Sequence, residues 1–164
     1  MKRYAAFVLC LVLLVSGCGV SGKRIKEPVN FYYPRDKIQY HEDAGVIGME
    51  TREASGHRDN LSYLLALYRL GPSSEDLRLP FPEGTAILMM EQTDTYLHLV
   101  LGSNAAAMSD AEFSLACACL TLTCGELAGV EQVTVTNAER TITMSREAIT
   151  LVDTSILDTM EETQ

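Results

Sequence analysis

The segment from Ser109 to Leu127 constrains the fold most, because it is a predicted helix that is apolar nearly all round. Ser109 and Glu112 form a capping box, in which the hydroxyl accepts from the Glu112 N–H and the carboxylate reaches back. Two apolar stripes follow at helical spacing: Phe113, Ala116, Cys117, Leu120, Cys124 and Leu127, and then Leu115, Cys119 and Leu122. Such a helix is stable when it is largely buried, so the rest of the chain must cover it.

A second, shorter helix is predicted from His57 to Leu70. Asp59 or Asn60 is positioned to cap its start, and Gly71 with Pro72 ends it. Its apolar residues recur at the positions that share one helical face: Leu61, Leu64, Leu65 and Tyr68.

The remaining apolar segments have the residue types and the spacing of β-strands. In a first predicted hairpin, the strand Ala86–Glu91 is followed by the strand Thr95–Leu101. In a second, Val130–Thr136 is followed by Arg140–Met144, with a turn at Asn137-Ala138. Val29–Tyr33 is a first strand, and Ala44–Glu53 is a weaker extended candidate. The order of elements predicts an α+β domain, with a mostly antiparallel sheet and two helices packed on one of its faces.

The amino terminus has the pattern of an export signal. Lys2 and Arg3 precede 11 apolar residues from Ala5 to Val15, which is the length of a signal-peptide core and too short for a membrane span. The following Ser16-Gly17-Cys18 resembles the lipobox of bacterial lipoproteins, and only a thiol accepts a diacylglycerol as a thioether. We therefore expect residues 1–17 to be removed, and Cys18 to carry membrane lipid on the extracytoplasmic face of the cell membrane.

Three further segments follow from this division of the chain. Residues 18–28 are predicted to be a lipidated tether, residues 29–145 the folded domain, and residues 146–164 a partly disordered C-terminal extension. Lys23, Arg24 and Lys26 lie near the lipid, where they either contact anionic headgroups or serve only solubility and topology.

A series of short motifs occurs in a fixed order from the first helix to the end of the long one. Leu70-Gly71-Pro72 closes the first helix, and Leu79 to Thr85 (LPFPEGT) leads into an apolar strand. Leu99 to Ser103 ends the next strand in a serine, and Thr121-Leu122-Thr123 lies late in the long helix before Gly129-Val130. In this order the motifs resemble the GerMN domain family of sporulation and spore-germination lipoproteins, over residues 31–144 and one copy of the domain. The resemblance implies a fold like that of ring-building modules and a role in envelope assembly without catalysis.

Cys117, Cys119 and Cys124 are the most conspicuous chemical cluster. On one helix Cys117 and Cys124 are about 10 Å apart by rise alone, which is too far for a disulfide. The C-A-C spacing is not that of a zinc knuckle. We expect buried thiols that act as small core residues; an interchain disulfide or a reactive thiol is the alternative.

No catalytic residue, metal site or cofactor is predicted. His41, His57 and His98 are scattered, and the acidic pairs fall in loops and in the tail. Met89-Met90 and the tyrosines are expected mostly in the core, with Tyr96 or His98 as a candidate partner contact on an exposed sheet face. The net charge of −9 argues against a nucleic-acid partner.

The sequence therefore favours a non-catalytic binding or assembly lipoprotein that has a protein partner in an envelope or sporulation complex. A hydrolase of the cell wall or spore cortex is one alternative, because paired carboxylates can come from anywhere in a fold. A receptor for a small ligand is the other.

Overall fold

The computed structural model describes residues 25–36 and 45–151. Its elements, in chain order, are β1 (Pro28–Pro34), β2 (Ile47–Glu53), α2 (Leu61–Arg69), β3 (Ile87–Gln92), β4 (Tyr96–Leu101), η1 (Ser103–Ala107), α3 (Asp110–Ala128), β5 (Gln132–Thr136), β6 (Thr141–Ser145) and η2 (Arg146–Ala148). The predicted signal peptide, Cys18, most of the tether, His41 and the tail beyond residue 151 lie outside the described residues.

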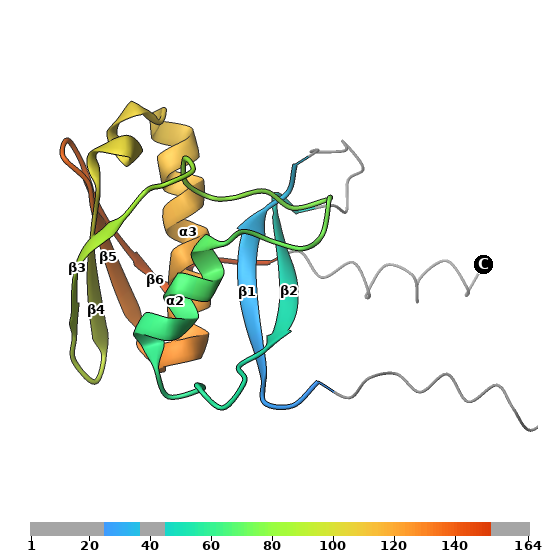
Figure 1. The fold of residues 1–164 in the computed structure, drawn as a ribbon. Helices are drawn as coiled ribbons and strands as arrows, with labels where there is room; N and C mark the ends of the chain where they lie inside the picture. The colour runs from blue at the N-terminus through green and yellow to red at the C-terminus, as the bar shows by residue number, and fades with distance from the viewer. Residues whose placement is uncertain (1–24, 37–44, 152–164) are drawn as a thin grey trace, which may run out of the picture.

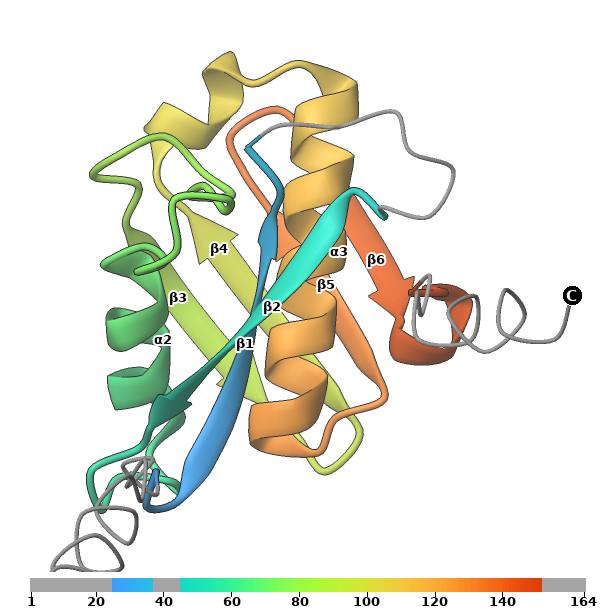
Figure 2. The ribbon, with the colours of Figure 1, turned by 90° about the vertical axis from the view of Figure 1, so that its right-hand side faces the viewer.

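The helices form a middle layer between two β-structures (Figures 1 and 2). On one side is a four-stranded sheet in the order β3-β4-β5-β6, and on the other is the two-stranded ribbon β1-β2. The predicted α+β class is confirmed, with both helices on one face of the larger sheet. The sequence did not indicate that β1 and β2 form a separate layer across the helices from that sheet.

Both predicted hairpins are present in the larger sheet. β3 pairs with β4 and β5 pairs with β6, each antiparallel. β4 and β5 pair in parallel, because α3 lies between them in the chain and returns it to the starting end of the sheet. The sheet is thus mostly antiparallel, as predicted, with one parallel pair at its centre.

Helix α3 is buried as its apolar surface requires. Ten of its residues are buried: Phe113, Ala116, Cys117, Cys119, Leu120, Thr121, Leu122, Thr123, Cys124 and Gly125. The predicted capping box is present, and Gly129, in the left-handed conformation at φ 69°, ends the helix. By length and composition alone α3 would suffice to cross a membrane, but here it is the core helix between sheet and ribbon.

The shorter helix α2 begins and ends close to the predicted positions. The Asn60 side chain accepts from the Tyr63 N–H over 3.0 Å, so Asn60 is the N-cap. Gly71 follows the last turn with φ +89°, a conformation that non-glycine residues rarely adopt. The buried residues of α2 are Leu64, Leu65 and Tyr68, all from the predicted stripe.

The β1-β2 ribbon is joined to both helices by specific contacts. The backbone N–H of Tyr32 donates to Thr123 Oγ1 of α3 over 3.0 Å, which satisfies a donor on the edge of β1 that faces away from β2. Phe31 and Tyr33 pack against Tyr68 of α2, with ring centroids 5.7 and 4.6 Å away. These contacts cover the side of the helix layer that the four-stranded sheet leaves open.

Candidate functional site

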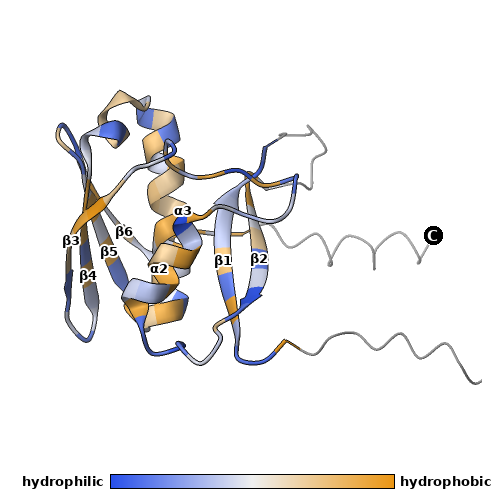
Figure 3. Cartoon of the chain, in the orientation of Figure 1, coloured by the Kyte–Doolittle hydropathy of each residue, from blue (hydrophilic) through white to orange (hydrophobic). Residues whose placement is uncertain are grey.

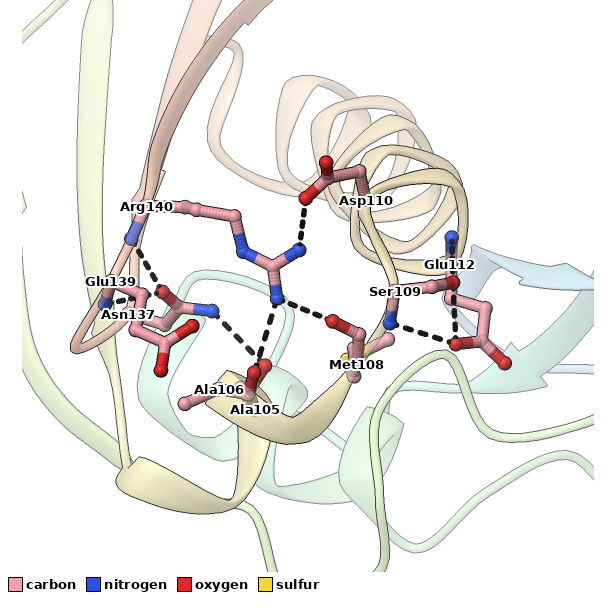
Figure 4. Close-up of polar contacts among 9 residues, drawn as sticks. All are labelled: Ala105, Ala106, Met108, Ser109, Asp110, Glu112, Asn137, Glu139 and Arg140. Carbon is pink, nitrogen blue, oxygen red and sulfur yellow. Dashed lines mark hydrogen bonds and ion pairs between the residues drawn. The ribbon is translucent and has the colours of Figure 1, made fainter.

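The largest polar cluster in the described residues is a structural clamp at the start of α3 (Figure 4). The Arg140 guanidinium donates to the carbonyls of Ala106 and Met108 at 3.3 and 2.6 Å and pairs with Asp110 at 2.6 Å. It also lies over the Phe113 ring, 4.8 Å from the centroid. Apart from the exposed Asp110 carboxylate, these partners are backbone carbonyls and a core ring, so the cluster holds η1, α3 and β6 together.

The β5–β6 turn is formed by the side chain of Asn137. Its Oδ1 accepts from the N–H groups of Glu139 and Arg140 at 2.9 and 2.8 Å, and its Nδ2 donates to the Ala105 carbonyl at 3.0 Å. An asparagine side chain can replace a backbone turn in this way. The hairpin therefore closes without a glycine.

A second clamp connects β2 to the end of α2. Arg52 donates to the carbonyls of Leu67 and Gly71, and its Nε lies 2.5 Å from Glu50 Oε1. Burial alone would raise the pKa of Glu50, but the hydrogen bonds from Arg52 and from two backbone N–H groups outweigh it and lower the pKa. This half-buried acid is held charged by its partners and is engaged in structure.

The three cysteines of α3 are free and buried. Burial raises the pKa of each thiol to about 12, so almost none is in the reactive thiolate form at neutral pH. The expectation of core thiols agrees with this placement.

His98 lies on the face of the four-stranded sheet that points away from α3 and its cysteines. It alternates along β4 with Leu97 and Leu99, which face the helices. The structure therefore forms no Cys–His pair from His98.

Tyr96 and His98 lie together on the outer face of the four-stranded sheet, as predicted. They are half-buried, with ring centroids 6.4 Å apart, and His98 Nε2 lies 3.0 Å from Thr136 Oγ1. The threonines of β5 and β6 continue this face, and Thr134 Oγ1 lies 2.7 Å from Thr143 Oγ1. The hydroxyls thus bond to one another, and a partner contact at Tyr96 or His98 stays a prediction.

The expectation that Met89 and Met90 belong to the core is wrong. Leu88, Met89 and Met90 are 67%, 44% and 36% exposed. Met89 pairs with Val100 and so points to the face of the sheet away from the helices, whereas Met90 points to the helix face at the open side of β3, an edge strand that pairs with β4 alone in the described sheet. Figure 3 shows the start of β3 in orange at that edge, before the strand becomes hydrophilic toward the hairpin. Leu88 stands where the β3–β4 register shifts at a bulge, which turns it away from the ladder.

An open groove separates this apolar edge from α2. It has a volume of about 220 Å³, and the residues that line it are Ser62, Leu65, Ala66, Arg69, Ile87, Leu88, Met89 and Met90. We call β3 together with this groove the β3 edge. Natural proteins usually shield such an apolar edge with charges, proline or a covering segment. The β3 edge is therefore the candidate functional site.

Sequence analysis missed the β3 edge for an identifiable reason. The run AILMME is equally compatible with a central strand and with an edge strand, since both are apolar at this length. A residue with a charge or a proline would have marked the edge, but the run has only Glu91 at its end. Which strand pairs on only one side is decided by sheet order, which local sequence does not encode.

The best-enclosed cavity lies under the loop from Leu79 to Thr85. It is bordered by Tyr68, Leu101 and Leu120, and its internal volume is about 40 Å³. One water molecule takes about 30 Å³ of liquid, so this space is far smaller than an organic ligand requires.

Within the described residues no group of three or more His, Cys, Asp or Glu side chains is placed to hold a metal ion.

Comparisons with known proteins found similarity in structure alone. No protein-family model matches the chain, and no curated protein matches it. A candidate lipoprotein from Clostridium perfringens is similar with a TM-score of 0.45 and 12% identity, over 77% of this chain and 95% of that one.

The tandem GerMN domains of the sporulation protein GerM from Bacillus subtilis are similar with a TM-score of 0.48 and 21% identity, over 75% of this chain. The match spans 43% of that tandem protein, which is less than half of its length.

Proposed function

We propose that this chain is a membrane-anchored extracytoplasmic lipoprotein whose single GerMN-like domain is a non-catalytic binding or assembly module. Its setting is the sporulation, germination or cell-envelope machinery. The leader and lipobox pattern through Cys18 supports the anchoring, and the resemblance in sequence supports the setting. The proposal assigns no catalytic residue to the chain.

One observation carries the binding role: the exposed apolar β3 edge. Folding leaves Leu88, Met89 and Met90 in contact with solvent, next to a groove whose lining includes the side chains of Leu65 and Ala66. Burying such a surface against a partner gains about 25 cal/mol per Å² of apolar area. The hydrogen bonds of Arg140 and Arg52, in contrast, are made to groups within the fold.

Membrane anchoring supports a weak contact of this kind. Lipid on Cys18 would confine the domain to a thin layer at the membrane, where its effective concentration toward a partner in the same layer is high. At such a concentration, the small contact area of one edge strand and its groove is enough for binding.

A pull-down from cross-linked cells tests the binding role. We compare the wild-type chain with Leu88→Lys, which places a charge on the β3 edge, and with the matched control Thr143→Lys on β6, the opposite edge of the sheet. We expect the protein captured by the wild type to be lost with Leu88→Lys and retained with Thr143→Lys. Equal capture by both variants, or capture of bulk membrane proteins alone, contradicts the proposal.

Mass spectrometry of the mature chain tests the anchoring. We expect an N-terminus at Cys18 with two or three fatty-acyl chains attached, and we expect Cys18→Ala to release the protein from the membrane fraction. A chain that keeps Met1 and carries no acyl mass would refute this part of the proposal.

A further inference from the structure

Methionine is the oxidisable sulfur on the surface of the described domain. The three cysteines of α3 are buried, and burial raises the pKa of each thiol to about 12, so neither access nor thiolate character favours their oxidation. Of the five methionines in the described residues, Met108 and Met144 pack against the core. Met49, Met89 and Met90 are exposed, so an oxidant that reaches the folded domain meets these three thioethers first.

Two of the exposed thioethers lie side by side in the β3 edge. Met89 pairs with Val100 and points to the outer face of the sheet, whereas Met90 pairs with Leu99 and points to the helix face. Both belong to the lining of the groove along α2. Met49, in contrast, is in β2, on the other side of the helix layer. The apolar character of the candidate site thus depends on two side chains that oxidation makes polar.

Peroxide converts methionine into methionine sulfoxide without a further reactant. A sulfur lone pair attacks one peroxide oxygen, and the O–O bond breaks as the S–O bond forms. The proton left on the transferred oxygen moves to the departing hydroxide, which becomes water. The thioether loses two electrons and the peroxide gains them. The new sulfoxide oxygen is a hydrogen-bond acceptor, and burying it in an apolar contact without a donor is unfavourable.

We propose that Met89 and Met90 are an oxidation-sensitive switch in the β3 edge: peroxide converts both to sulfoxide, and the oxidised edge loses its partner. This inference rests on the proposed function and adds the regulation of the same site. The proposed extracytoplasmic location places the edge in an oxidising environment. A methionine sulfoxide reductase reverses the reaction, so the switch returns to its apolar state.

The first measurement follows oxidation in the folded protein. The full-length chain in its membrane is treated with hydrogen peroxide, and peptide mass spectrometry records the gain of one oxygen at each methionine over time. We expect Met89 and Met90 to react at least about fivefold faster than Met108 and Met144, because their side chains are exposed. In urea the four rates should become equal. Equal rates in the folded chain overturn the proposal.

The second measurement asks whether oxidation at this edge controls binding. Cross-linked cells that express the wild type, Met89→Leu/Met90→Leu or the matched control Met49→Leu are compared in pull-downs with and without peroxide. Leucine keeps the apolar volume but has no sulfur to oxidise. The readout is capture with peroxide divided by capture without it, so a change in basal capture cancels.

We expect this ratio to fall about tenfold for the wild type and for Met49→Leu, and to stay near one for the double variant. Treating the oxidised wild type with a methionine sulfoxide reductase should restore capture. A wild-type ratio that does not fall, an equal fall in the double variant, or a loss that the reductase fails to reverse overturns the switch, and the binding role stands. If the untreated wild type captures no specific partner, both proposals are wrong.

Discussion

The hydroxyl of Tyr33 donates to the backbone carbonyl of Tyr68 over 3.0 Å, and the two rings stack with centroids 4.6 Å apart. Tyr33 belongs to β1 and Tyr68 to α2, and both side chains are almost completely buried. This pair attaches the ribbon to the helix that forms one wall of the groove. The position of the candidate site thus depends on a contact between residues 35 positions apart.

Removing the Tyr33 hydroxyl should weaken this attachment. We expect Tyr33→Phe to lower the free energy of unfolding by about 1–2 kcal/mol, because it deletes one buried hydrogen bond and keeps the ring stack. Urea denaturation followed by circular dichroism measures the change. Tyr63→Phe, at a partly exposed tyrosine of the same helix, is the control and should change stability by less than about 0.5 kcal/mol. Equal effects would show that the buried bond contributes nothing specific.

The Glu50–Arg52 pair predicts a pH dependence of stability. The folded pKa of Glu50 is lowered: burial opposes this, but the hydrogen bonds from Arg52, Ser73 and Ser74 prevail. A depressed acid pKa stabilises the fold above the unfolded value, about 4.3, and this contribution is lost as pH falls through the folded pKa. Glu50→Gln should cost about 2 kcal/mol at pH 7, in line with charged hydrogen bonds.

The test is the difference in unfolding free energy between wild type and Glu50→Gln, measured from pH 7 to pH 3. The difference should begin to shrink near pH 4, because the carboxyl of the unfolded wild type takes up its proton there, and it should keep shrinking until the folded carboxyl is protonated at lower pH. Glu83→Gln, at an exposed loop position, is the control and should follow the wild type throughout. A difference that is constant with pH would show that the charge of Glu50 does not stabilise the fold.

Arg140 should contribute through its backbone carbonyl contacts more than through its ion pair. Asp110 has a side chain that is 92% exposed, and such surface pairs contribute about 0–1 kcal/mol. Arg140→Met should therefore cost about 2–3 kcal/mol, since the carbonyls of Ala106 and Met108 lose charged donors, whereas Asp110→Asn should cost less than about 1 kcal/mol. Thermal and urea unfolding of the two variants decide this, and the reverse order would be evidence against the clamp.

The thiols of α3 should resist alkylation in the folded protein. With pKa values of about 12, the thiolate fraction at pH 8 is on the order of 10⁻⁴, and burial also blocks access. Iodoacetamide labelling followed by peptide mass spectrometry should find Cys117, Cys119 and Cys124 unmodified in buffer and fully modified in 8 M urea, a denaturing concentration. Rapid labelling of any one of them without denaturant would revive a reactive-thiol role.

Local sequence was sufficient for the elements whose ends are set by neighbouring residues. Ser109 and Glu112 cap α3 as predicted, Asn60 caps α2, and glycines at 71 and 129 end the two helices. These features depend on hydrogen bonds and backbone conformations within a few residues of one another. The burial of α3 also followed from its own composition.

Sequence alone determined that an apolar helix would lie at the centre of an α+β domain, because a helix that is apolar nearly all round is stable only when covered. Only the tertiary structure decided that β5 returns parallel to β4, that the β1-β2 ribbon crosses the far side of α3, and that β3 stands at the edge. These outcomes depend on pairings between residues far apart in the chain. The exposure of Met90 is one result, since a side chain on the helix face of an edge strand is covered on one side only, and that of Met89 is another, since its register with Val100 turns it away from the helices.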